Sequence, residues 1–247
     1  MTTPGQRPAL AELVTEFQRV LCVVAHPDDI EYGLSAAVHR WTTEGVDVSY
    51  FLLTRGEAGI ATMPPPQAGP VREAEEVESA RIVGVSNVRF GEHRDGSIEY
   101  GAALRRDIAR EIRRVQPDLV VGGTFDVKFP GGFLNQADHR AVGLATVDAV
   151  ADAGNRWIFP ELVDEGLEPW EGVKSLAISA SQEPTHFVDV SAHFEASVSS
   201  LEAHEAYNSA LPETFPNPRE LLGGILGQGG QAAGVEYAVV LEVIDRR

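Results

Sequence analysis

A histidine and two adjacent carboxylates follow a strongly apolar run near the start of the chain. Residues 21–25 are apolar, and His26-Pro27-Asp28-Asp29 comes next. The run predicts a buried strand, and ligands of open α/β sheets lie beyond the carboxyl ends of the strands. Because side chains alternate along extended backbone, Asp28 and Asp29 are expected to differ in role. Buried carboxylates need a cation or a shared proton, so this stretch predicts half of a metal site.

The other half is predicted much later in the chain. A hydrolytic zinc-type site needs three protein ligands and one open position. His26 and Asp29 are two candidates, and His139, which follows the tip of a later predicted strand, is the third. A metal held there lowers the pKa of water toward about 7, and Asp28 is then available as general base. These residues predict metal-assisted hydrolysis, with zinc as the metal and ferrous iron as the alternative.

Apolar patterns alternate in period along the chain and predict the elements that position these residues. Strands over 19–25 and 46–53 flank a helix over 34–44, which indicates a βαβ unit, a parallel sheet and an α/β fold. No linker divides the chain, so residues 1–247 are expected to form one domain. Less regular parts are expected as a helix over 8–17, a loop over 64–70, a helix over 191–207 begun by Ser191, and a loop or flap over 211–234.

Composition restricts the class of protein. The net charge of −17 argues against nucleic-acid or anionic-membrane partners, which require basic patches. The chain has no apolar run long enough for a membrane span and no signal-peptide pattern, so a cytoplasmic protein is expected. The single cysteine, Cys22, lies inside the first predicted strand and is expected to be a small buried apolar side chain.

Motifs spread in order along most of the chain resemble those of one enzyme family. Residues 25–31, AHPDDIE, are similar to the AHPDDE signature of LmbE-like, PIG-L-type zinc N-acetylglucosaminyl deacetylases, with one residue inserted before the glutamate. Other segments that resemble motifs of this family are 54–59 (TRGEAG), 72–75 (REAE), 80–85 (ARIVGV), 95–96 (DG), 138–141 (DHRA) and a late stretch from 189 to 204.

The resemblance implies a single Rossmann-like, three-layer domain with a mostly parallel sheet and its site at the carboxyl ends of the strands. It implies zinc on His26, Asp29 and His139, and a substrate that is an N-acyl amino sugar or a related amide. Hydrolysis of that substrate yields acetate and a free amine. Arg72 and Asp95 fall where the family contacts the sugar.

One position departs from the family pattern. The family motif His-Pro-Asp-His begins with a histidine that stabilises the oxyanion or protonates the leaving amine, and Gln136 stands there instead. An amide donates a hydrogen bond but delivers no proton, and one lost oxyanion donor costs roughly 10²–10³ in rate. Either Gln136 donates while Asp28 carries the proton, or His204 takes over, or the activity is weak or altered. Ala206-Tyr207 also replaces the family's late Ser-Gln.

Three functions therefore stay open at the level of sequence. The first is a zinc-dependent N-deacetylase of amino sugars with a small-molecule N-acylated substrate. The second is an amidase for a non-sugar N-acyl compound or a thiol conjugate. The third is a binding protein that keeps its metal but turns over little because of Gln136. The pattern decides neither the substrate nor whether the chain forms a homo-oligomer.

Overall fold

The first buried strand lies inside an eight-stranded sheet. The computed structural model describes residues 9–246. The strands are β1 (Ala11–Glu12), β2 (Arg19–Val24), β3 (Asp47–Leu52), β4 (Asn87–Phe90), β5 (Leu119–Gly123), β6 (Ser175–Ser179), β7 (His186–Asp189) and β8 (Ala238–Asp245). Their order across the sheet is β1-β7-β8-β6-β5-β2-β3-β4. Only β8 runs antiparallel to its neighbours, so the predicted parallel sheet is confirmed as a mostly parallel, mixed one.

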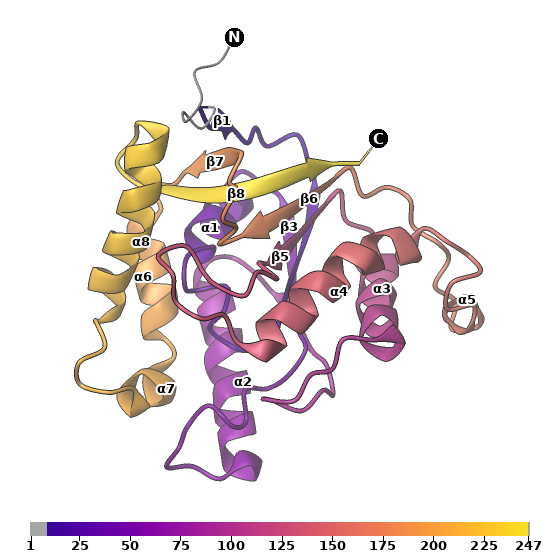
Figure 1. The fold of residues 1–247 in the computed structure, drawn as a ribbon, viewed down its shortest axis with the longest axis horizontal. Helices are drawn as coiled ribbons and strands as arrows, with labels where there is room; N and C mark the ends of the chain where they lie inside the picture. Colours follow the sequence, from indigo (N-terminus) through magenta and orange to yellow (C-terminus); the bar gives the residue numbers. More distant parts are fainter. Residues whose placement is uncertain (1–8, 247) are drawn as a thin grey trace.

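Helices cover both faces of the sheet and complete the predicted three layers (Figure 1). One face carries α1 (Ser35–Thr43), α2 (Pro65–Ile82), α6 (Phe194–Glu202) and α8 (Pro218–Ala233). The other face carries α3 (Ala102–Val115), α4 (Ala137–Ala153) and the short α5 (Glu161–Asp164). Helix α7 (Glu205–Ala210) follows α6 after two residues that are not helical. The α/β fold class with one domain is therefore confirmed.

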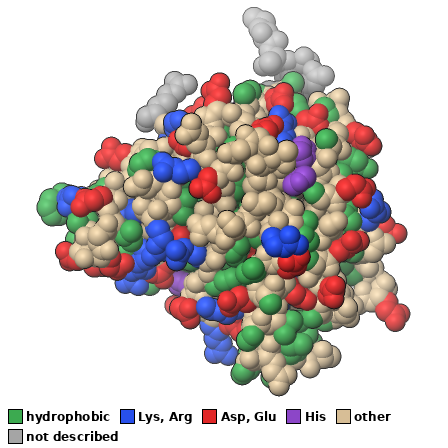
Figure 2. Space-filling model, turned by 180° about the vertical axis from the view of Figure 1, so that it is seen from behind, with side chains coloured by type: hydrophobic (Ala, Val, Ile, Leu, Met, Phe, Trp, Pro, Cys, Tyr) green, Lys and Arg blue, Asp and Glu red, His purple; other side chains and the backbone are tan. Residues whose placement is uncertain are grey.

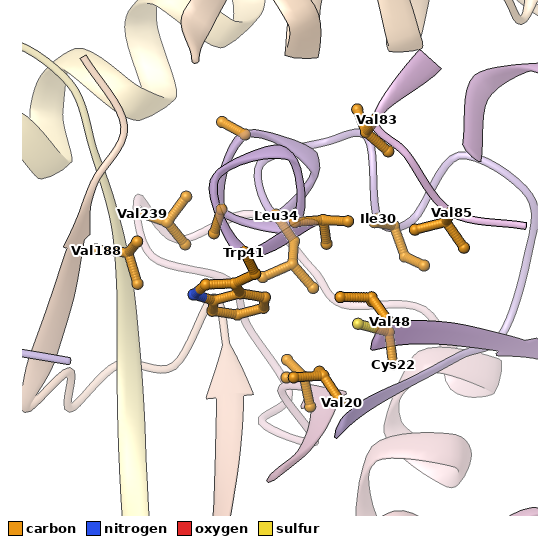
Figure 3. Close-up of a cluster of buried hydrophobic side chains, with 14 of the residues drawn as sticks. Val20, Cys22, Ile30, Leu34, Trp41, Val48, Val83, Val85, Val188 and Val239 are labelled. Atoms are coloured by element: carbon orange, nitrogen blue, oxygen red, sulfur yellow. The ribbon is translucent and has the colours of Figure 1, made fainter. Parts of the chain in front are cut away.

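Strand β2 is buried on both sides, which explains its continuous apolar sequence. Val20 and Cys22 point into the core on the α1 side, and Leu21 and Val23 into the core on the α4 side. Cys22 has no exposed surface and is a free thiol, as expected, and burial raises its pKa. Trp41 of α1 lies among the apolar side chains of the first core (Figure 3).

The helix expected over 8–17 is wrong within the described residues, which begin at 9. Ala11 and Glu12 instead form the edge strand β1, paired in parallel with β7. Phe17 packs against the core although it is not in a helix: its ring meets that of Trp41 edge-on at a centroid distance of 5.5 Å. The apolar spacing indicated which side chains pack against the core. It could not reveal that the backbone of residues 11–12 forms hydrogen bonds with the neighbouring strand β7 instead of helical ones.

Two boundaries differ from expectation near prolines and serines. The loop expected over 64–70 instead forms the first turns of α2. Pro65 and Pro66 are tolerated in the first turn, where proline lacks only an N–H that would be unpaired, and Pro70 lies inside the helix. The helix expected over 191–207 is two helices, α6 and α7, separated at Ala203 and His204. Ser191 does not begin it, since its hydroxyl donates to Asp189 Oδ1 at 2.7 Å.

The glycine-rich segment expected as a loop or flap over 211–234 is mostly the helix α8. Asn217 begins this helix, where its side chain accepts the N–H of Glu220 at 3.0 Å. A Cβ on Gly229 would lie 2.1 Å from the carbonyl oxygen of Ala238 on β8. Glycine here allows the helix to lie close against the strand, so the composition reflects close packing and the loop prediction was wrong.

The surface agrees with the acidic composition. Figure 2 shows acidic side chains distributed over the face seen there, with basic and apolar side chains between them. Within residues 9–246, no helix combines the length and the apolar character that crossing a membrane requires.

Replacing the central core tryptophan tests the fold. Trp41→Ala is expected to lower the free energy of unfolding by about 3–5 kcal/mol, since it leaves a cavity in a closely packed core. Trp157, 81% exposed, is the matched control, and Trp157→Ala should change that free energy by less than about 0.5 kcal/mol. Urea denaturation followed by circular dichroism measures both. Equal losses in the two variants would contradict the assigned core.

Candidate metal centre

The three predicted metal ligands lie together at the carboxyl ends of neighbouring strands. His26 and Asp29 follow β2, and His139 is in the first turn of α4, after β5. His139 Nε2 lies 3.0 Å from Asp29 Oδ1 and 3.2 Å from His26 Nδ1. His26 Nδ1 lies 3.7 Å from Asp29 Oδ2. Ligand atoms bound at about 2.0–2.2 Å to one zinc ion have comparable separations, so these side chains fit a shared cation.

The second nitrogen of each histidine has its own partner. His26 Nε2 lies 3.1 Å from Asp95 Oδ1 and 3.3 Å from Asp138 Oδ2. His139 Nδ1 lies 3.0 Å from Asn135 Oδ1. A ring N–H that donates to an oxygen leaves the lone pair of the other nitrogen free for a metal. Both imidazoles are therefore oriented as metal ligands usually are.

A second set of acidic side chains lies around His26. Asp95 and Asp138 also lie within metal-binding distance of His26. The Asp138 carboxylate, however, accepts the backbone N–H groups of Gly96 at 2.8 Å and Ile98 at 3.0 Å. Asp95 Oδ2 accepts the N–H of Ala58 at 2.8 Å. Both oxygens of Asp138 are thus held by backbone donors, whereas Asp95 binds the backbone through Oδ2 and faces His26 through Oδ1.

The carboxylates make this position favourable for positive charge. Burial lowers the pKa of His26, but hydrogen bonds with Asp138, Asp29 and Asp95 outweigh it and raise the pKa to about 12. Burial also opposes ionisation of Asp29, yet His139 and His26 hold the pKa of that carboxyl well below its usual range. A dication satisfies the same carboxylates, and two imidazoles with one carboxylate suit zinc or ferrous iron.

Asp28, the expected base, is buried beside the metal ligands. Its Oδ2 lies 3.1 Å from Arg72 Nη2. Burial raises the pKa of Asp28 to about 6, although the Arg72 guanidinium opposes this shift. A carboxylate with a pKa near neutrality is well matched to accept a proton from water.

Arg72 and Asp95, predicted to contact a sugar, are directed at the protein itself. The Arg72 guanidinium is buried and donates to the carbonyl oxygens of Pro27 at 2.5 Å and Gly56 at 3.0 Å. A Cβ on Gly56 would lie 2.1 Å from Arg72 Nη1, and the φ of Gly56 is +60°, so glycine is required there. Asp95 faces His26. The contacts of Arg72 and Asp95 are therefore with the residues that form the site.

Gln136 and His204 lie in very different surroundings. Gln136 is the N-cap residue of α4, and its exposed side chain makes no capping hydrogen bond. His204 has no exposed surface, and its Nε2 lies 3.6 Å from Glu31 Oε2 and 3.7 Å from Glu76 Oε2. Such complete burial argues against direct proton delivery from His204 to a substrate.

Sequence reasoning assigned no role to four side chains that surround the site: Asn135, Asp138, Glu76 and Tyr207. Asn135 and Asp138 had a signal, because both flank His139 and a ligating histidine needs an oxygen partner. Glu76 also had one, since it is four residues from Arg72 and therefore on the same face of α2. Tyr207 was noted only as part of the Ala206-Tyr207 departure from the family's Ser-Gln, and only the tertiary structure brings its ring to 4.1 Å from the Arg72 guanidinium carbon.

Comparison with known proteins agrees with this geometry. The family model described as GlcNAc-PI de-N-acetylase (PIG-L) matches residues 21–150, which is more than half of the chain. Diacetylchitobiose deacetylase of Thermococcus kodakarensis is 29% identical over 204 residues, covering 82% of this chain and 73% of that protein. Relatives of the chain are thus deacetylases of amino sugar derivatives.

Solved structures show the same fold. N,N'-diacetylchitobiose deacetylase of Pyrococcus horikoshii, in complex with an inhibitor, superposes with a TM-score of 0.82 at 24% identity and covers 93% of this chain and 85% of that one. GalB of Pseudomonas putida, a 4-carboxy-2-hydroxymuconate hydratase, gives a TM-score of 0.75 at 19% identity and covers 93% of this chain and 97% of that one. At these identities the likeness establishes the fold alone, and the fold hosts more than one reaction.

Removing a partner of His26 tests whether Asp95 supports the metal or contacts the substrate. Asp95→Ala is expected to weaken zinc binding about 10–100-fold, because His26 loses an oxygen that orients its ring. Glu99→Ala, which removes an exposed carboxylate four residues later, should leave zinc affinity unchanged. Competition with a chromogenic chelator measures both affinities. Unchanged affinity with a raised KM would instead assign Asp95 to the substrate.

Proposed function

The chain belongs to the GlcNAc-PI de-N-acetylase (PIG-L) family, and on that premise we propose that it is a metal-dependent N-deacetylase. Its substrate is an N-acylated amino sugar or a closely related small molecule, and its products are a carboxylic acid and a free amine. The observation that carries the proposal is the convergence of His26 Nδ1, Asp29 Oδ1 and His139 Nε2, each with its remaining polar atoms paired elsewhere.

The proposed roles divide the site into two parts. His26, Asp29 and His139 hold the metal, zinc or ferrous iron, which when bound polarises the acyl carbonyl and acidifies water. Asp28 accepts the proton from the attacking water and passes it to the leaving amine. Asp29 and His139 each keep about a sixth of their side-chain surface exposed (17% and 18%), so substrate reaches this side from solvent.

Gln136 is the proposed substitute for the family histidine. Two observations support this role: Gln136 is exposed, and it stands at the N-terminus of α4, three residues before His139. Its amide donates a hydrogen bond to the developing oxyanion, while proton transfer stays with Asp28 because an amide holds no transferable proton. His204 has no part in substrate contact in this proposal, because it is fully buried.

A soluble, low-molecular-weight substrate agrees with the acidic composition, and we propose a cytoplasmic protein without a nucleic-acid partner. The competing functions keep specific support. Gln136 in place of histidine favours a metal-retaining binding protein. GalB is a hydratase with the same fold, so the fold is compatible with reactions other than deacetylation.

Replacing the proposed base tests the reaction. Asp28→Asn is expected to reduce amine release at least about 10²-fold, because the amide cannot accept the proton, while zinc content stays unchanged. Release of amine by the zinc-loaded protein is measured over a panel of N-acetyl amino sugars and N-acyl amides, with Asp47→Asn on the exposed start of β3 as control.

The same assay separates the alternatives. Chelation should abolish turnover and added zinc should restore it. Turnover unaffected by Asp28→Asn would remove Asp28 as base. A zinc-loaded native protein that releases no amine from any compound of the panel would favour the binding protein.

Restoring the family histidine tests the oxyanion side of the site. Gln136→His is expected to leave kcat unchanged or to increase it, because imidazole both donates a hydrogen bond and delivers a proton. The side chain is exposed, so the melting temperature should stay the same. Steady-state kinetics and thermal denaturation measure the two quantities. A large fall in kcat would show that Gln136 has a role of its own.

A further inference from the structure

Helix α2 holds Asp28 at two points. Arg72 and Glu76 are four residues apart and therefore share one face of the helix. Arg72 Nη2 lies 3.1 Å from Asp28 Oδ2, so it contacts the side chain. Glu76 Oε2 accepts the backbone N–H of Asp28 at 3.2 Å, so it contacts the main chain. One helix face thus determines both the backbone and the carboxylate of the proposed base.

The backbone that Glu76 holds is strained. Asp28 has a φ of 92°, in a region that L-residues avoid. Such a conformation is unfavourable and persists only where its surroundings maintain it. The hydrogen bond to Glu76 is a contact of this kind, since it fixes the direction of the Asp28 N–H.

Two side chains from the α6–α7 junction stand behind the two α2 residues. His204 Nε2 lies 3.7 Å from Glu76 Oε2 and 3.6 Å from Glu31 Oε2. The ring of Tyr207 lies 4.1 Å from the Arg72 guanidinium carbon. Each α2 residue that contacts Asp28 therefore has its own partner between residues 204 and 207, outside the stretch 21–150 that the family model matches.

The burial of Glu31, Glu76 and His204 is not explained by folding stability alone. Glu31, Glu76 and His204 are all completely buried. Glu31 Oε1 accepts a hydrogen bond from Ser79, but Glu31 Oε2, Glu76 Oε1 and both ring nitrogens of His204 have no hydrogen-bond partner among the described residues. Buried ionisable side chains of this kind usually add less stability than apolar side chains of the same volume. The contact of Glu76 with Asp28 supplies a functional reason for keeping these three side chains.

We propose that Glu76, with His204 behind it, is a positioning residue that holds Asp28 in its left-handed conformation and so sets the place of the Asp28 carboxylate. This inference rests on the proposed function, in which Asp28 is the base. Asp29 is held independently, because its Oδ2 accepts the N–H groups of Ala25 and His26. Loss of Glu76 therefore disturbs Asp28 and leaves the metal ligands in place.

The test compares Glu76→Met with Glu76→Gln in the zinc-loaded full chain. Methionine matches glutamate in length but accepts no backbone hydrogen bond of comparable strength, whereas glutamine keeps an acceptor oxygen. Glu76→Met should lower kcat about 10²-fold, as expected for a misplaced catalytic group, with KM and zinc content unchanged. Glu76→Gln should recover at least a tenth of native kcat. Glu78→Met, an exposed position on the same helix, is the control.

A crystal structure of zinc-loaded Glu76→Met gives a readout that does not depend on turnover. Asp28 should leave its positive φ while His26, Asp29 and His139 stay in place. If the native protein proves inactive on the whole panel, the proposed function fails, and this structure still decides whether Glu76 positions Asp28. If Glu76→Met does not fold, His204→Gln provides the same test. It removes the imidazole that lies against Glu76, and it should also lower kcat.

Three results would overturn the positioning role. One is an Asp28 that keeps its φ in Glu76→Met, together with an unchanged kcat. Another is a rise in KM in place of a fall in kcat. The third is a native protein with two metal ions per chain of which Glu76→Met loses one, since Glu31, Glu76 and His204 also lie within metal-binding distance of one another. That outcome would make the group a second metal site.

Discussion

The carboxylates buried around the tip of β2 impose the constraint on which the site depends. Three carboxylates contact the His26 ring, those of Asp29, Asp95 and Asp138, and Asp28 is two residues away in the chain. Carboxylates removed from water are stable only beside positive charge or several donors. The structure meets this requirement in three ways. Backbone N–H groups bind Asp95 and Asp138, a buried arginine pairs with Asp28, and two imidazoles lie against Asp29.

Sheet topology satisfies that constraint with segments far apart in sequence. Strands β2 and β5 are parallel neighbours, so the loops that follow them end at the same edge. This geometry places His139 against His26 across 113 residues of chain. Helix α2 approaches from the other side of β2 and brings Arg72 to Asp28, with Gly56 leaving the space that the guanidinium occupies. This edge of the sheet is thus assembled from the segment after β2 and from helices α2 and α4, while the strands beneath are apolar.

The fold hosts different reactions in different proteins, so the chemistry must reside in the side chains at this edge. The ligand trio lies within residues 21–150, the stretch shared with the family model. His204 and Tyr207 lie beyond it and pack against the two residues that hold Asp28. The shared part of the chain thus carries the candidate metal ligands, and the less regular last third packs against the two residues that contact Asp28.

Sequence alone determined the α/β class, the buried strand β2 and the meeting of His26, Asp29 and His139 at the strand tips, because these follow from apolar period, residue type and strand-tip logic. The separate role of Asp28 stays a prediction. It failed where tertiary contact outweighed local pattern. Residues 11–12 pair with a sheet edge, Pro65 begins a helix, and the glycines of α8 permit close packing against β8. Only the tertiary structure decided that Arg72 and Asp95 face the protein, that His204 is fully buried and that Glu76 reaches the Asp28 N–H. Those relations join elements that are distant along the chain, and no local spacing encodes the distance between them.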